Sequence, residues 1–129
     1  MDIPKQANLK EMSESTLQHI LEPLLSELSE VIREVKYPLR KKLLKEVIIS
    51  QKEELAELIV ALSHWERGKA EDIDVGEEII DTLINSLLII FFLKAPIKDL
   101  TKLQDKKLTK FWRRLGEKGF ITNGLPESK

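Results

Sequence analysis

Apolar residues recur at helical spacing through four stretches of the chain, and no stretch of useful length alternates apolar and polar residues as a strand would. The pattern predicts four helices, over residues 14–35, about 39–66, 72 or 74 to about 93, and 97 to about 115. Pro38 and Pro96 mark boundaries between them, because proline cannot continue a helix. The expected fold is all-α, with four main helices in a bundle.

The first helix carries two signals that affect its extent. Residues 1–13 have little apolar periodicity and are expected to form a loose lead-in, with Ser13 or Ser15 capping the helix start. Pro23 lies inside the apolar pattern. It predicts either a kink or two helices that meet at Glu22, since proline removes a backbone hydrogen-bond donor.

The second and third helices are expected to be joined by a tight turn. Gly68 is a suitable residue at the end of the second helix, where glycine readily takes a positive φ. Asp72 or Asp74 is expected to cap the start of the third helix.

The third helix is apolar at almost every position from Ile79 to Leu93. Four of its polar residues, Glu78, Asp81, Thr82 and Asn85, fall on one narrow strip at spacings of three and four. A helix this apolar is expected to be buried on most sides, and one small bundle gives it too little cover. The pattern therefore favours a homo-oligomer, either a dimer or a tetramer.

The composition narrows the class of protein. The chain has 129 residues, no cysteine and a net charge of −1. This length suits one domain, the absence of cysteine suits a reducing cytoplasm, and the charge argues against a general nucleic-acid binder. The start of the chain lacks the apolar segment of a signal peptide, and the run 87–93 is too short to span a bilayer. We expect a soluble cytoplasmic protein with no membrane partner.

Charge is strongly segregated along the chain. Residues 53–81 hold ten acidic and two basic side chains, whereas residues 94–118 hold nine basic and three acidic ones. Two differently solvated helix faces would explain this segregation. The alternative is a site that binds a metal ion and an anion together.

The acidic residues lie on one turn of each of two successive helices. Glu53, Glu54 and Glu57 share a turn of the second helix, and Glu78 and Asp81 share a turn of the third. Glu54 lies near the apolar stripe of its helix, and an unpaired carboxylate in such surroundings is unfavourable. A divalent cation would compensate these charges, and Mg²⁺ prefers oxygen ligands. Mn²⁺ is a possible substitute for Mg²⁺.

Zinc is a poor candidate for this site. The chain has no cysteine and only two histidines, His19 and His64. His19 has no acidic or nucleophilic partner in the sequence pattern, and serine, threonine and histidine form no recognisable catalytic triad.

The two acidic motifs also carry a resemblance to a known family. Glu53-Glu54-x-x-Glu57 followed by Glu78-x-x-Asp81 resembles the EExxE…ExxD signature of the MazG-like all-α NTP pyrophosphohydrolases. That superfamily includes MazG proteins, dimeric dUTPases, dCTP pyrophosphatases and phosphoribosyl-ATP pyrophosphohydrolases. The segment 110–114, KFWRR, is similar to a basic segment that contacts the triphosphate in MazG proteins.

The resemblance implies Mg²⁺-dependent hydrolysis of a nucleoside triphosphate between its α- and β-phosphates, giving a nucleoside monophosphate and pyrophosphate. It implies four metal ligands, Glu54, Glu57, Glu78 and Asp81. Glu53 would be a further ligand or would activate the attacking water, and Glu54 is the second candidate for a catalytic role. Glu77 offers an alternative ligand position, but Glu78 keeps the i, i+3 relation to Asp81.

Four further residues are candidates for substrate binding. Lys110 and Arg114, at i and i+4, could neutralise the triphosphate, although a solvated basic face is an equal alternative. Asn85 continues the carboxylate strip and could bind a phosphate, sugar or base. Trp65 could stack on a base, although a core position is the more common role of a tryptophan at this spacing.

We expect three functional segments: an N-terminal segment over 1–37 that covers the core or mediates oligomerisation, a MazG-like catalytic core over 38–115, and a tail over 116–129. Two alternatives to the leading function stay open. One is phosphoribosyl-ATP hydrolysis, and the other is a non-catalytic helical oligomer that serves as an adaptor or regulatory module.

Overall fold

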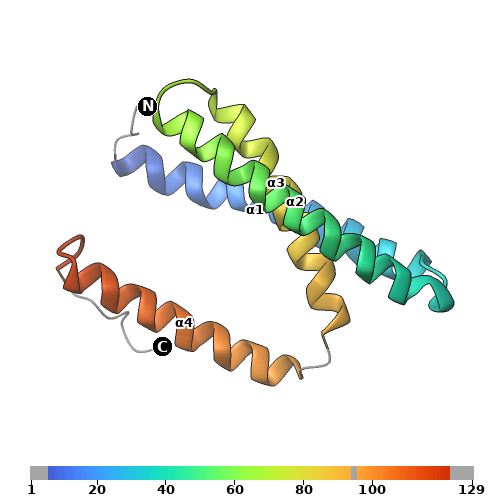
Figure 1. The fold of residues 1–129 in the computed structure, drawn as a ribbon. Helices are drawn as coiled ribbons and strands as arrows, with labels where there is room; N and C mark the ends of the chain where they lie inside the picture. Colours follow the sequence, from blue (N-terminus) through green and yellow to red (C-terminus); the bar gives the residue numbers. More distant parts are fainter. Residues whose placement is uncertain (1–5, 94–95, 123–129) are drawn as a thin grey trace. The chain divides into compact units, whose positions relative to one another are not determined.

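The structure is a computed structural model that describes residues 6–93 and 96–122, with side chains from Glu14 onward. Within these residues all regular structure is helical, and no strand occurs. Four α-helices follow one another, with one 3-10 turn between the first two (Figure 1). They are α1 (Gln6–Glu34), η1 (Tyr37–Leu39), α2 (Arg40–Glu66), α3 (Asp72–Phe92) and α4 (Ile97–Glu117). The predicted all-α class with four main helices is confirmed.

The start of α1 corrects the sequence-based expectation. The backbone is helical from Gln6, so residues 6–13 are not a loose lead-in, and neither Ser13 nor Ser15 caps the helix. The segment 6–13 contains neither glycine nor proline, and it is rich in residues with high helix propensity. Residues 1–5 of the predicted lead-in lie outside the described residues.

Pro23 does not divide α1 into two helices. The helix continues through this position to Glu34, so the prediction of two helices meeting at Glu22 is wrong. The Pro23 side chain is exposed, while Leu24 is half-buried and Leu28 is buried on the neighbouring turn. Packing of these apolar residues offsets the backbone hydrogen bond that proline removes, a loss of about 3 kcal/mol in an isolated helix interior.

The chain divides into two compact units, Met1–Leu93 and Lys94–Lys129. In the first unit, α2 and α3 form an antiparallel hairpin, and α1 packs against α3 (Figure 1). The second unit contains α4. The predicted functional division at residues 37/38 and 115/116 differs from this division into compact units and stays a prediction. Residues 123–129 of the predicted tail lie outside the described residues.

The core of the first unit is small. Leu28, Val47 and Leu88 bring α1, α2 and α3 together, and five half-buried residues surround them: Ile32, Leu43, Ile84, Leu87 and Ile89. Fewer apolar side chains of α3 are buried in the single chain than its sequence predicts. Its residues Ile79, Ile80, Ile90 and Phe91 are exposed in the single chain.

No helix among the described residues is long and apolar enough to cross a membrane.

Candidate metal centre

The turn between α2 and α3 fixes how the two helices meet. Gly68 has a φ of +72°, a left-handed conformation that favours glycine. The N–H of Gly68 donates to the Trp65 carbonyl at 3.0 Å, and the N–H of Lys69 donates to the His64 carbonyl at 2.7 Å. This pair of hydrogen bonds is a Schellman motif, so the predicted role of Gly68 at the end of α2 is confirmed.

The start of α3 is tied to the end of α2. The N-cap residue is Glu71, not the predicted Asp72 or Asp74. The Asp74 carboxylate accepts the backbone N–H of Glu71 at 2.9 Å, which holds the first turn closed. The indole N–H of Trp65 donates to Asp72 Oδ1 at 2.7 Å and so links the two helix ends.

Three of the predicted carboxylates lie together between the two helices. Glu54 of α2 and Glu78 and Asp81 of α3 each offer one oxygen, and these oxygens all lie within 4.8 Å of one another. Glu78 and Asp81 share a face of α3 because they are three residues apart. All three residues are half-buried. We call these three residues the carboxylate cluster.

Two oxygens of the carboxylate cluster are buried without a hydrogen-bond partner, Glu54 Oε2 and Glu78 Oε2. A buried polar atom without a partner is unfavourable, and an ionised carboxylate without a compensating charge is more so. The donor set consists of oxygens alone, which suits Mg²⁺ or Mn²⁺ better than zinc. The residues therefore fit a hard divalent cation.

The electrostatics of the cluster agree with this fit. Burial and the negative charges of Glu57, Asp81 and Glu78 raise the pKa of Glu54 from its ordinary value of 4.5 to about 7. Burial also raises the pKa of Glu78, to which the charges of Glu57 and Asp81 add, although the interaction with Glu54 acts in the opposite direction. Both carboxyl groups hold a proton more readily than an exposed glutamate does, and a metal ion would displace that proton.

The other predicted acidic residues lie outside the carboxylate cluster. Glu57 is exposed, and its charge raises the pKa of both Glu54 and Glu78. Its oxygens are not among those that lie within 4.8 Å of one another, so its role as a fourth ligand stays a prediction. Glu53 is exposed and is not among the three clustered carboxylates, and Glu77 is also exposed.

A polar network continues from the cluster along the same helix interface. The Gln51 side-chain amide donates to Ser86 Oγ at 2.8 Å and to the Thr82 carbonyl at 3.3 Å. The Asn85 amide donates to Ser50 Oγ at 3.2 Å, and Asn85 is only 8% exposed. These four side chains, Ser50, Gln51, Asn85 and Ser86, form an interhelical clamp one turn from Glu54 and Asp81.

Of these four clamp residues, only Asn85 is predicted from the sequence to have a functional role, as a candidate substrate ligand. Its amide is directed to Ser50 within the protein, and its substrate role stays a prediction. The signal that could have found the clamp is the pair Ser50-Gln51 one turn before Glu54. These polar residues lie next to an apolar stripe, just as Asn85-Ser86 do in α3.

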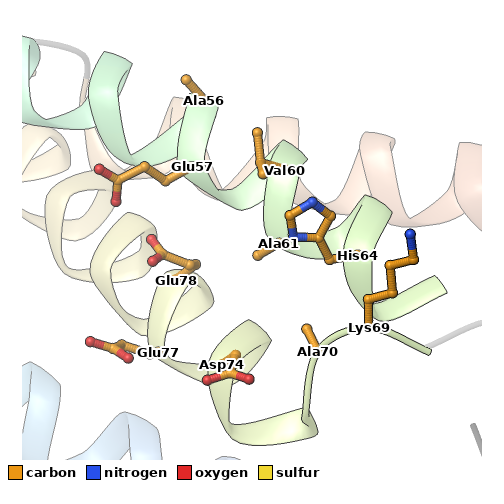
Figure 2. A pocket seen from close by; sticks show the side chains of 10 residues that line it. All are labelled: Ala56, Glu57, Val60, Ala61, His64, Lys69, Ala70, Asp74, Glu77 and Glu78. Atoms are coloured by element: carbon orange, nitrogen blue, oxygen red, sulfur yellow. The ribbon is translucent and has the colours of Figure 1, made fainter. Parts of the chain in front are cut away.

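A cavity of about 600 Å³ lies beside the cluster, on the side of the turn (Figure 2). Figure 2 shows Glu57 and Glu78 at one end of this cavity and His64 and Lys69 at the other, with Ala61 between them. Its lining residues come from both helices and the turn: Ala56, Glu57, Val60, Ala61, His64, Lys69, Ala70, Asp74, Glu77 and Glu78. A cavity that opens directly onto candidate metal ligands is a suitable place for a ligand.

The remaining predicted substrate residues lie elsewhere. Trp65 is half-buried and holds Asp72 through its indole N–H, and it does not line the cavity. Lys110 and Arg114 are exposed residues of α4 in the second compact unit. Their predicted contact with a triphosphate stays a prediction.

Comparisons of the chain with protein-family models, with curated proteins and with solved structures give no match. The resemblance to MazG-like pyrophosphohydrolases therefore rests on the sequence motifs alone.

Proposed function

We propose that this protein is a Mg²⁺-dependent nucleoside triphosphate pyrophosphohydrolase that cleaves (d)NTPs between the α- and β-phosphates. The observation that carries the proposal is the carboxylate cluster, in which Glu54 and Glu78 each keep one buried oxygen without a partner beside Asp81. A merely solvated acidic face would not bury these atoms. The same residues belong to the paired acidic motifs in the sequence.

Glu54, Glu78 and Asp81 would hold the metal, with Glu57 as the fourth ligand at the edge of the cavity. When bound, Mg²⁺ supplies charge for the phosphate oxygens and lowers the pKa of a coordinated water. The carboxylates set where a phosphate can lie, because they fix the cation between α2 and α3. Both helices are held in register by the interhelical clamp.

Glu53 and Glu54 are the two candidates for orienting and deprotonating the attacking water. The position of Glu54 supports it, since its carboxyl group lies in the cluster, where a coordinated water would also lie. Glu53 is exposed and would act from outside the cluster. Exchange of each residue for glutamine separates the two roles.

The decisive measurement is release of pyrophosphate from a panel of dNTPs, NTPs and phosphoribosyl-ATP with Mg²⁺. Turnover of at least one nucleoside triphosphate is expected, with loss of turnover in Glu57→Gln. Glu46→Gln, at an exposed position of the same helix, is the matched control and should retain activity. Activity on phosphoribosyl-ATP alone would select that alternative. No turnover of any compound, or full activity in Glu57→Gln, would refute the proposal.

The assembly proposed for this enzyme is a cytoplasmic homodimer or homotetramer. Its support is the exposed apolar surface of α2 and α3, in which Ile59 is 66% exposed and Ile73 is 77% exposed. The absence of cysteine suits the reducing cytoplasm. The same surface would serve a non-catalytic helical oligomer. Such an oligomer would show no change in melting temperature with Mg²⁺ or Mn²⁺, with or without nucleotide.

A further inference from the structure

The cavity beside the carboxylate cluster follows the α2–α3 hairpin from the candidate metal ligands to the turn. Glu57 and His64 are two helical turns apart, which corresponds to about 10 Å along α2. The volume of about 600 Å³ falls within the range of roughly 300–1,000 Å³ typical of small-molecule sites. The cavity is therefore long enough and large enough for an organic group that extends from a phosphate at the cluster.

Small side chains keep this space open. Ala56 and Ala61 of α2 and Ala70 of the turn line the cavity, together with Val60. Larger apolar residues at these positions would fill the space between the hairpin's two arms, as Val47 and Leu88 do in the core. The lining thus combines four apolar side chains with six polar or charged ones, which suits a flat ring and a sugar.

The charges of the lining decide which part of a nucleotide fits. Four carboxylates face the cavity, from Glu57, Asp74, Glu77 and Glu78, against the single ammonium group of Lys69. A triphosphate chain placed along the cavity would pass Asp74 and Glu77, and like charges repel it there. An uncharged nucleoside has no such penalty. Its hydroxyl and N–H groups can donate hydrogen bonds to these carboxylates.

The far end of the cavity is fixed by the turn. The backbone N–H of Lys69 donates to the carbonyl of His64 at 2.7 Å, so the two residues that end the cavity are joined. His64 offers a ring for stacking and a nitrogen for hydrogen bonding, and Lys69 offers a donor. These are groups that can contact the face and edge of a base.

We propose that this cavity binds the nucleoside of the substrate, with the α-phosphate at the carboxylate cluster and the β- and γ-phosphates directed away from the cavity. This inference rests on the proposed function and adds the orientation of the nucleotide. Ala56, Ala61 and His64 are the residues that set which nucleosides fit.

The test separates the nucleoside from the phosphate chain by calorimetry, with no turnover required. Two ligands are titrated in the presence of Mg²⁺: a non-hydrolysable α,β-imido deoxynucleoside triphosphate and inorganic tripolyphosphate. Ala61→Leu places a larger side chain in the cavity, and Ala56→Leu does so from an exposed position that leaves the fold intact. Ser63→Leu, exposed on α2 but outside the cavity lining, is the matched control.

Both cavity variants are expected to weaken binding of the nucleotide analogue on the order of tenfold or more, because the added methyl groups occupy the space of the ring. Binding of Mg²⁺ and of tripolyphosphate should stay within about twofold of the unchanged protein. Ser63→Leu should bind all three like the unchanged protein.

Two outcomes would overturn the inference and leave the proposed function standing. The first is unchanged binding of the analogue in both cavity variants. The second is a loss of tripolyphosphate binding equal to the loss of analogue binding, which would place the phosphate chain in the cavity. If the unchanged protein binds neither Mg²⁺ nor the analogue and releases no pyrophosphate, the proposed function fails and the inference fails with it. If the unchanged protein and Ala56→Leu both release pyrophosphate with the same KM, the inference is contradicted and the proposed function is not.

Discussion

The ionisation of the Glu54 carboxyl group depends strongly on the neighbouring residues. One of its oxygens is buried without a hydrogen-bond partner, and the charges of Glu57, Asp81 and Glu78 surround it. Ionisation is therefore unfavourable until a proton or a cation compensates the charge. The residue should oppose folding when it is ionised alone and favour folding when a metal ion is bound.

Replacing Glu54 by glutamine tests both effects. At pH 7.5 without metal, Glu54→Gln should raise the melting temperature, because it removes a charge that three other carboxylates repel. The unchanged protein should gain about 2.7 kcal/mol of unfolding free energy at a free Mg²⁺ concentration one hundred times the Kd. The variant should gain almost none.

Calorimetric or fluorescence melting with and without Mg²⁺ measures these changes. Glu46→Gln removes an exposed charge from the same helix and should behave like the unchanged protein. A variant that is less stable without metal, yet responds fully to Mg²⁺, would mean that Glu54 is a structural residue.

The raised pKa of Glu54 also predicts how stability depends on pH. Between pH 4.5 and about pH 7, the folded protein holds a proton on Glu54 that the unfolded chain has released. The free energy of unfolding must therefore decrease as pH rises through this window, the reverse of the usual carboxylate behaviour. In EDTA, the melting temperature of the unchanged protein should fall from pH 5 to pH 7.5 relative to that of Glu54→Gln.

Magnesium should reverse this trend, since the metal and the proton compete for the same oxygens. The increase in melting temperature caused by Mg²⁺ should be small at pH 5 and should grow up to pH 8. An identical pH profile for the unchanged protein and Glu54→Gln would contradict the raised pKa.

At the scale of elements, the interhelical clamp sets the register of α2 against α3. Gln51 pairs with Ser86 and Asn85 pairs with Ser50, and this antiparallel register also brings Glu54 opposite Asp81. Hydrogen bonds between half-buried side chains are specific about distance, so a slip of one residue would break both of them. The clamp is therefore a positioning device for the candidate metal ligands.

Asn85→Ala distinguishes this role from direct contact with substrate. Loss of the bond to Ser50 and of packing at a buried position should lower the free energy of unfolding by about 1–3 kcal/mol and weaken Mg²⁺ binding. Urea denaturation and calorimetry measure the two effects. Thr109→Ala, at a half-buried position of α4, controls for loss of a small polar side chain. Weaker nucleotide binding at unchanged stability would instead support the predicted substrate role.

Helix positions could be read from the sequence because their causes are local. Apolar spacing located α2, α3 and α4 to within a few residues, and Gly68 and Pro96 marked their ends. The start of α1 was not predicted, and the sequence left open whether the chain forms one helix or two at Pro23. At Pro23 the signal of a single residue is outweighed by apolar contacts of the flanking turns with another helix, and these contacts depend on tertiary structure.

The candidate site was predictable in part for the same reason. The i, i+3 spacing of Glu78 and Asp81 puts both on one face, and the apolar surroundings of Glu54 direct it to the interior. The partners of Gln51 and Asn85 could not be read off, since each lies more than thirty residues away and depends on the helix register. The cavity likewise results from small residues on two elements, and no single sequence motif predicts it.

At the scale of the whole molecule, charge divides along the chain as the two compact units do. The carboxylate cluster belongs to the first unit, and Lys110 and Arg114 belong to the second. All seven basic residues of α4 are exposed, and three acidic ones accompany them. An exposed basic helix alone is not evidence of phosphate binding, so the proposed role of this pair needs a control of equal charge.

The double variant Lys110→Gln/Arg114→Gln provides this test. If the pair neutralises the triphosphate, KM should rise about tenfold or more while Mg²⁺ binding is unchanged, since charged hydrogen bonds contribute about 1.5–3 kcal/mol each. Lys98→Gln/Lys102→Gln removes the same charge at the same i, i+4 spacing on the same helix, and it should have little effect. Equal increases of KM in both double variants would mean that only the net charge of α4 matters.

The exposed apolar residues of α2 form a second surface that concerns the whole molecule. Four of them share one stripe of the helix at spacings of three, four and seven, and they are Ile48, Leu55, Ile59 and Leu62. This spacing is that of a helix that packs against another helix. With only four buried apolar residues in the described part of the chain, a single copy has a small core for its size.

Covering this stripe by a second copy would bury apolar side chains that are each 38–66% exposed, and full burial of one such side chain contributes about 1.5–3 kcal/mol. We therefore expect the unchanged protein to sediment as a homo-oligomer and Leu55→Glu/Ile59→Glu to sediment as a monomer, because two buried carboxylates would oppose the contact. Analytical ultracentrifugation measures the mass, and circular dichroism verifies that the helices persist. Lys42→Glu/Ile49→Glu introduces two carboxylates at exposed positions of α2 that share no spacing of three, four or seven with the stripe, and it should leave the oligomer intact. If the unchanged protein is a monomer at micromolar concentration, or if the stripe variant keeps the mass of the oligomer, this stripe does not hold two copies together.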